Sequence, residues 1–132
     1  MTQNTAFSRL SPVLLTGDTV TLAVVTIFGF ATHGEAATAG LRMATTFLPL
    51  LVAWLLAAAP LDLLSPQAAR RRPSLLRLLW AGLLAAPLAA WLRALWLGHA
   101  VVPIFVAVLG GVGAPALVAW RYLWWWWRAR RK

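Results

Sequence analysis

Few side chains in this sequence could take part in acid–base or metal chemistry. The acidic residues are Asp18, Glu35 and Asp62, the histidines are His33 and His99, and there is no cysteine. Without cysteine, the chain has no disulfide, thiolate metal site or redox-active thiol. It also contains no glycine-rich phosphate loop and no Ser–His–Asp arrangement. We therefore expect a protein that is not an enzyme and that holds no cofactor and no metal.

Asp18 needs an explanation because it lies inside an apolar stretch. A charge at the centre of a membrane costs about 2.5–3.5 kcal/mol on insertion scales, so it should face other helices and find a partner there. We expect Arg121 as that partner, with Arg77 as the second candidate. An ion pair that fixes how two helices dock is the favoured interpretation, and a titrating carboxylate in a proton or cation path is the alternative.

A second polar cluster is expected at the other end of the same stretches. It consists of His33, Glu35 and Arg93, and we call it the outer polar cluster. We expect Glu35 to pair with Arg93 or Arg42 and so hold a surface loop. A metal site formed by His33, Glu35 and His99 is chemically feasible but disfavoured, because the spacing of these ligands is not diagnostic.

The composition places these side chains in a membrane protein. Hydrophobic residues make up 61% of the 132 residues and charged residues 11%, against about 45–50% and roughly 25% in ordinary globular domains. The mean hydropathy of +0.76 agrees. A soluble chain of this size could not bury so much apolar surface. The net charge of +9 does not indicate nucleic-acid binding here, because the basic residues flank apolar stretches, where they meet anionic lipid headgroups.

Four apolar stretches must position the polar residues, and each should be a helix, because a backbone in lipid has to satisfy its own hydrogen bonds. Within a single domain of residues 1–132, we expect spans at about 12–32, 43–59, 75–97 and 101–122, followed by a basic aromatic tail at 123–132. Ser11 and Ser74 are suitable N-caps, and Gly98 a suitable helix stop. A cleaved signal peptide is the alternative for the first stretch, but Asp18 interrupts its apolar run.

Proline lies inside three of the expected spans, at positions 49, 87 and 115. The sequence Gly110-Gly111-Val112-Gly113 before Pro115 predicts a weak helix with a break. Broken helices often line transport sites. Small residues also permit close helix packing, which is the interpretation we favour.

The basic residues predict the orientation in the membrane, because Lys and Arg mark cytoplasmic loops. With four spans, ten of the twelve basic residues fall on the side of the two termini and the second loop, and only Arg42 and Arg93 fall on the other side. We therefore expect an all-α, up-down-up-down bundle in the prokaryotic inner membrane with both termini in the cytoplasm.

Tryptophan and arginine dominate the end of the chain. Tryptophan favours the headgroup level of a membrane, so these residues predict an interfacial anchor backed by lipid-binding charge. A tryptophan-lined site for a partner subunit or a pigment is the alternative. The expected anchor comprises Trp120, Trp124, Trp125, Trp126 and Trp127.

Several short motifs in the four stretches resemble those of one family. They are Gly17-Asp18, Gly29 with His33, Phe47-Leu48-Pro49, Ala53-Trp54, Leu92-Arg93, Pro103-Ile104-Phe105-Val106 and Trp120-Arg121. Over about residues 13–122 the chain resembles the small four-span prokaryotic family catalogued as domain of unknown function number thirty fifty-four. In that family an arginine commonly follows the glycine of the Gly–His motif, whereas this sequence has Phe30 there. The resemblance implies fold and topology, but no activity.

Two functional classes fit these observations. The favoured one is a non-catalytic accessory or scaffold subunit that packs against a larger membrane complex or against itself, since polar residues are scarce within the spans. The alternative is a small oligomeric transporter or channel that uses Asp18 and the broken fourth span.

A scaffold should have a dry layer between Asp18 and the outer polar cluster, with the threonines at 19, 21 and 26 bonded back to helix carbonyls. The residues expected to form that layer are Val24, Val25, Ile27 and Phe28, facing Leu83, Leu84 and Leu88.

Overall fold

The computed structural model describes residues 10–34 and 39–132, and within them all regular structure is helical. The helices are α1 (Pro12–Thr32), α2 (Gly40–Ala58), α3 (Pro66–Arg70), α4 (Leu75–Leu97) and α5 (Pro103–Arg130). All but the short α3 are long and apolar enough to cross a membrane. The expected all-helical fold is therefore confirmed, with four helices that are candidate membrane spans.

The predicted bounds hold for two of the spans, and two need correction. α1 and α4 occupy the expected residues, each with a serine N-cap whose hydroxyl accepts a backbone N–H: Ser11 from Leu14, and Ser74 from Arg77. α2 begins at Gly40 rather than 43 and ends at Ala58 rather than 59. α5 begins at Pro103 rather than 101 and continues past the predicted end at 122 to Arg130. The sequence after position 115 contains no further glycine or proline to stop it.

The expected break in the fourth span is also wrong. α5 is one helix across Pro115, just as α2 and α4 continue across Pro49 and Pro87. A proline removes one helical N–H donor, and membrane helices tolerate that loss when neighbouring groups satisfy the freed carbonyl.

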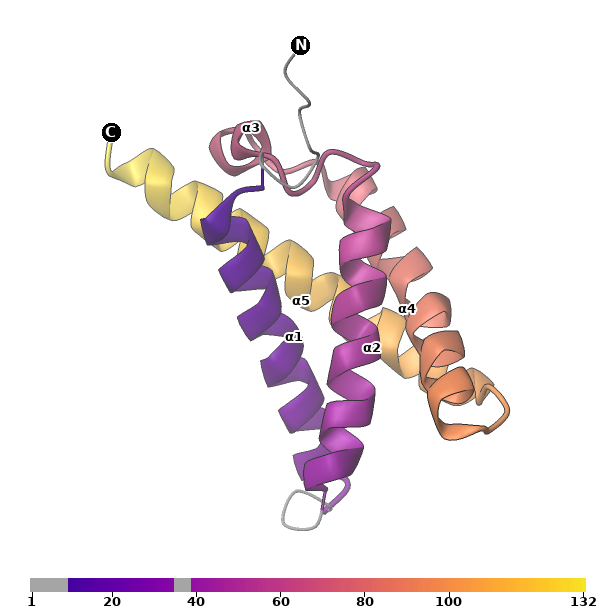
Figure 1. Ribbon diagram of the computed structural model, residues 1–132. Helices are drawn as coiled ribbons and strands as arrows, with labels where there is room; N and C mark the ends of the chain where they lie inside the picture. Colours follow the sequence, from indigo (N-terminus) through magenta and orange to yellow (C-terminus); the bar gives the residue numbers. More distant parts are fainter. Residues whose placement is uncertain (1–9, 35–38) are drawn as a thin grey trace.

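Successive long helices run in opposite directions, with α3 at the end of the bundle where α1 starts and α5 finishes (Figure 1). α2 packs mainly on α1 and α4, and α5 packs on the same two helices. Small residues let α4 and α5 approach closely. A Cβ added to Gly82 would lie only 2.5 Å from the Cβ of Ala114, and one added to Gly110 would lie 3.3 Å from that of Ala86. This contact agrees with a packing role for Gly82 and Gly110, whereas a Cβ added to Gly111 or Gly113 would meet nothing within 4 Å.

Candidate functional site

The start of α1 turns Asp18 toward the interior of the bundle. Leu14, Asp18 and Leu22 follow one another at intervals of four residues on a single helix face, and all three are buried. The backbone N–H of Ser11 donates to the carbonyl oxygen of Leu64 at 2.7 Å, which ties the beginning of the helix to the segment after α2. As a result, Asp18 is 0% exposed although it lies less than two turns from the helix start.

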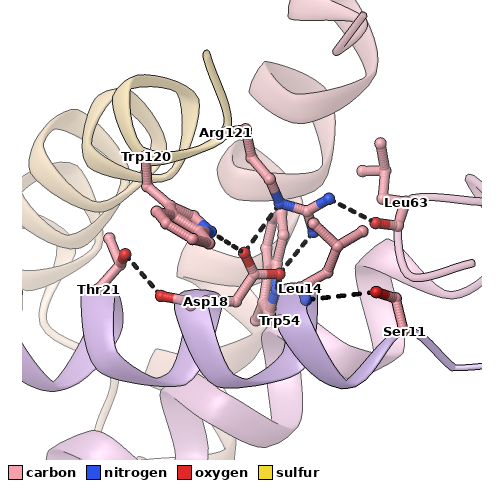
Figure 2. Close-up of polar contacts among 9 residues, drawn as sticks. Ser11, Leu14, Asp18, Thr21, Trp54, Leu63, Trp120 and Arg121 are labelled. Carbon is pink, nitrogen blue, oxygen red and sulfur yellow. Dashed lines mark hydrogen bonds and ion pairs between the residues drawn. The ribbon is translucent and has the colours of Figure 1, made fainter. Parts of the chain in front are cut away.

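The carboxylate of Asp18 accepts four hydrogen bonds from two other helices (Figure 2). From α5, Arg121 donates through Nε to Oδ1 at 2.9 Å and through Nη2 to Oδ2 at 2.6 Å, a bidentate ion pair. Trp54 on α2 donates through Nε1 to Oδ2 at 2.8 Å, and Trp120 on α5 donates through Nε1 to Oδ1 at 3.1 Å. Each carboxylate oxygen therefore has two donors.

Arg121 extends this network to the connection between α2 and α4. Its Nη1 donates to the carbonyl oxygen of Leu63 at 2.7 Å, and the side chain is 4% exposed. The structure thus brings together Asp18 and Arg121, the preferred pair, whereas the second candidate, Arg77, is exposed. One positive and one negative charge balance inside the bundle, so neither is left uncompensated.

The two tryptophan donors to Asp18 were not anticipated from the sequence. The sequence pattern predicts Trp120 as part of the interfacial anchor, and it marks Trp54 only as part of a motif that resembles the family. The available signal was chemical: Trp54 is fully buried, and a buried indole N–H usually finds an acceptor. Asp18 is the acidic residue within the four apolar stretches, so it was the acceptor to consider.

Gly17 makes room for the ring of Trp120. A Cβ at this position would lie 1.8 Å from Cζ2 of Trp120, a distance at which the ring has to move. Since the same ring carries the N–H that donates to Asp18, the absence of a side chain at Gly17 is a condition for the fourth hydrogen bond.

We expect Gly17→Ala to displace Trp120 and to lower the free energy of unfolding by about 1–3 kcal/mol, as overpacking does. Gly29→Ala on the same helix is the matched control, because its added Cβ meets nothing within 4 Å. Thermal unfolding in detergent, followed by circular dichroism, measures both variants. Equal melting temperatures for the two would contradict the close contact between Gly17 and Trp120.

A layer of buried leucines lies one helical turn beyond the carboxylate, on the side away from α3. It consists of Leu22 on α1, Leu50 on α2 and Leu117 on α5, and each is at most 3% exposed. These leucines lie four residues from Asp18, Trp54 and Arg121, respectively, on the same helices. The hydroxyls of Thr21 and Thr26 donate to helix carbonyls at 2.7 and 2.8 Å, as predicted. For Thr19 the prediction is wrong, because the contacts of the described residues include no such hydrogen bond.

Five of the seven residues predicted for the apolar layer were wrong, whereas Val25 is half-buried and Leu88 is half-buried against the core. Among the side chains expected there, Val24, Ile27, Phe28, Leu83 and Leu84 are exposed. The physical reason is helix order: α1 and α4 each pack mainly on α2 and α5 rather than on each other. Their remaining apolar faces point out of the bundle.

The structure describes the outer polar cluster only in part. His33 is the exposed C-cap of α1, His99 is exposed after α4, and Glu35 lies outside the described residues. The guanidinium of Arg93 lies over the ring of Phe105, 5.1 Å from its centroid. Among the described residues no group of three histidine or acidic side chains is placed to bind a metal.

The basic aromatic end of the chain fastens α5 to the connection between α2 and α4. The hydroxyl of Tyr122 donates to the carbonyl oxygen of Pro73 at 3.1 Å, and Nη1 of Arg128 donates to that of Ala69 at 2.8 Å. Trp124 lies between two other indoles, with ring centroids 6.0 Å from Trp120 and 5.4 Å from Trp127. The predicted tail is therefore the last part of a helix that contacts the rest of the protein.

Comparison with known proteins gives one match. The family model described as "Protein of unknown function (DUF3054)" matches residues 15–124, which confirms the resemblance seen in the sequence. No curated protein and no solved structure matches the chain. Three of the motifs that carry the resemblance, Gly17-Asp18, Ala53-Trp54 and Trp120-Arg121, meet at the buried carboxylate.

Proposed function

We propose a structural, non-catalytic role for this chain, which belongs to the family of proteins of unknown function DUF3054. In this proposal it is an accessory or scaffold subunit that packs against a larger membrane complex or against a second copy of itself. The observation that supports it best is the complete occupancy of the Asp18 carboxylate by four donors. Asp18 and its donors connect α1, α2 and α5.

A carboxylate used for transport needs different surroundings. It has to exchange partners or bind and release an ion, and it needs access to water for either. Asp18 is 0% exposed, and both of its carboxylate oxygens accept hydrogen bonds at 2.6–3.1 Å. Ion binding to this carboxylate would therefore require α2 and α5 to move away from it. The leucine layer formed by Leu22, Leu50 and Leu117 adds a second obstacle, because it contains no polar side-chain atom.

The second candidate is a small oligomeric transporter that uses Asp18. A cavity at the α3 end of the bundle is lined by Leu14 and Arg121, and this favours access to the ion pair from that end. The continuous α5 removes the other argument, a broken helix. Measurement of proton flux through reconstituted protein separates the two candidates.

The proposed location is the prokaryotic inner membrane, with both termini and α3 in the cytoplasm and anionic lipid headgroups as partners there. The ten-to-two distribution of basic residues supports this orientation. We expect a phosphatase reporter to be inactive when fused after residue 132 and active when inserted at residues 98–100. A fluorescent reporter that folds only in the cytoplasm should give the reverse pattern. Phosphatase activity at residue 132 would contradict the orientation.

A further inference from the structure

A basic cavity lies at the α3 end of the bundle, between α1, α5 and the connection from α2 to α4. It has a volume of about 70 Å³, more than one water molecule needs. Its polar lining includes Asp62, Arg71, Arg72, Arg77, Arg121 and Trp124. We propose that this cavity binds a single phosphate group, either that of a phospholipid headgroup or that of a soluble phosphate.

The charge of the lining favours an anion. Arg71 and Arg77 are exposed at their side chains, and neither has a side-chain hydrogen bond or ion pair among the contacts of the described residues. Arg72 also lines the cavity, and its guanidinium lies over the ring of Trp125, 5.7 Å from the ring centroid. Arg121 also lines the cavity, but its charge is balanced by Asp18. Three arginines against one carboxylate, Asp62, leave a net positive lining.

The N-terminus of α4 adds a second attraction. Ser74, the N-cap of this 23-residue helix, lines the cavity. The first backbone N–H groups of any helix lack partners within the helix, and they carry the positive end of its dipole. Phosphate groups bind readily at such positions. Here the helix end and the arginine side chains attract the same kind of ligand to the same cavity.

Trp124 forms part of the cavity wall. Its Nε1 atom is buried with no hydrogen-bond partner among the residues that the structure describes. The ring lies between those of Trp120 and Trp127, tilted by 35° and 31° to them. A buried indole N–H normally has an acceptor. Here the buried Nε1 atom has no surface open to the cavity, so the Trp124 ring contributes a wall of the cavity and not a donor to its ligand.

The test uses the full chain in detergent, with binding measured by native mass spectrometry. The probes are phosphatidylglycerol, diacylglycerol with the same acyl chains, and inorganic phosphate. We expect phosphatidylglycerol to bind one molecule per chain, and diacylglycerol, which lacks phosphate, not to bind. Arg71→Gln and Arg77→Gln should each weaken phosphatidylglycerol binding by about tenfold.

Two further variants make the test specific to the cavity. Asp62→Asn should strengthen binding by about threefold, because it removes the opposing carboxylate. Asparagine tolerates the positive φ of 54° at this position. Arg70→Gln is the matched control, since Arg70 is the exposed neighbour of Arg71 but does not line the cavity. It should leave binding unchanged.

The outcomes separate the source of the phosphate from the existence of the site. Displacement of phosphatidylglycerol by millimolar inorganic phosphate would support the site and identify a soluble phosphate as a ligand. Binding of phosphatidylglycerol that inorganic phosphate does not displace, but that the arginine variants weaken, would support a lipid headgroup as the ligand. Equal binding of diacylglycerol and phosphatidylglycerol, or equal effects of Arg70→Gln and Arg71→Gln, would overturn the proposal, as would failure of both phosphate probes to bind.

Discussion

Replacement of Asp18 by asparagine is expected to lower the free energy of unfolding by about 3–5 kcal/mol, the usual cost of leaving one buried charge without its partner. Arg121 would keep its positive charge in a site that is 4% exposed. The asparagine amide would also point N–H groups at a site where four donors already converge. Both effects reduce stability while changing the volume of the side chain very little.

Arg121→Gln should cost a similar amount, because it leaves Asp18 as the uncompensated charge. The double variant Asp18→Asn, Arg121→Gln should be less destabilised than the sum of the two single variants, since it buries no net charge. Trp54→Phe is a milder comparison, which keeps an aromatic ring and removes one donor at a cost of about 1–3 kcal/mol. Chemical unfolding in detergent, monitored by circular dichroism, measures the free energy of unfolding of the wild type, of both single variants and of the double variant. Additive losses for Asp18 and Arg121 would contradict a stabilising ion pair.

The ion pair between Asp18 and Arg121 could be predicted from the sequence, because a charge in lipid is costly without a partner. A carboxylate in an apolar span requires a partner, and Arg121 was the basic residue at a suitable depth in another span. The tryptophan donors could not be predicted in the same way. The aromatic pattern around Trp120 is typical of a membrane interface, and only the rotation of α5 about its axis turns this one indole toward Asp18.

The order of helices around the bundle could not be predicted either, and this is why five of the seven residues assigned to the apolar layer were wrong. In a membrane protein, side chains that face lipid are as apolar as those in the core, so hydrophobicity does not distinguish the two faces. Phe28 and Leu83 point outward and Leu22 and Leu117 inward, although all four are apolar. Small residues carry more information: the buried face of α4 includes Ala81, Gly82, Ala85, Ala86, Ala89 and Ala90.

Some helix bounds could likewise be predicted from the sequence, and others depend on contacts in the folded protein. Hydropathy and N-caps located the beginnings of α1 and α4, because Ser11 and Ser74 accept hydrogen bonds from the first turns of those helices. The end of α5 was placed eight residues too early, at 122 instead of Arg130. Hydropathy falls where the arginines begin, but the helix continues because Tyr122 and Arg128 bind the carbonyls of the connection between α2 and α4.

Protein reconstituted into lipid vesicles is expected to conduct no protons. A relay needs polar groups spaced within hydrogen-bond reach, and the layer beyond Asp18 consists of Leu22, Leu50 and Leu117. The hydroxyls of Thr21 and Thr26 on the same helix are engaged with backbone carbonyls. Asp18 itself is held by donors on two helices, so it has no free oxygen with which to pass a proton onward.

The most direct test of this structural role is the decay of a pH gradient across vesicles that contain the purified protein and a trapped pH-sensitive dye. We predict the same decay rate as in protein-free vesicles of the same lipid, before and after a potassium gradient with valinomycin imposes a membrane potential. Trp120→Phe, which keeps an aromatic ring but removes one of the four hydrogen-bond donors to the carboxylate, should also conduct no protons. A wild-type flux well above the protein-free rate, and lost in Asp18→Asn protein that keeps its helical circular dichroism spectrum, would contradict the structural role and favour the transporter.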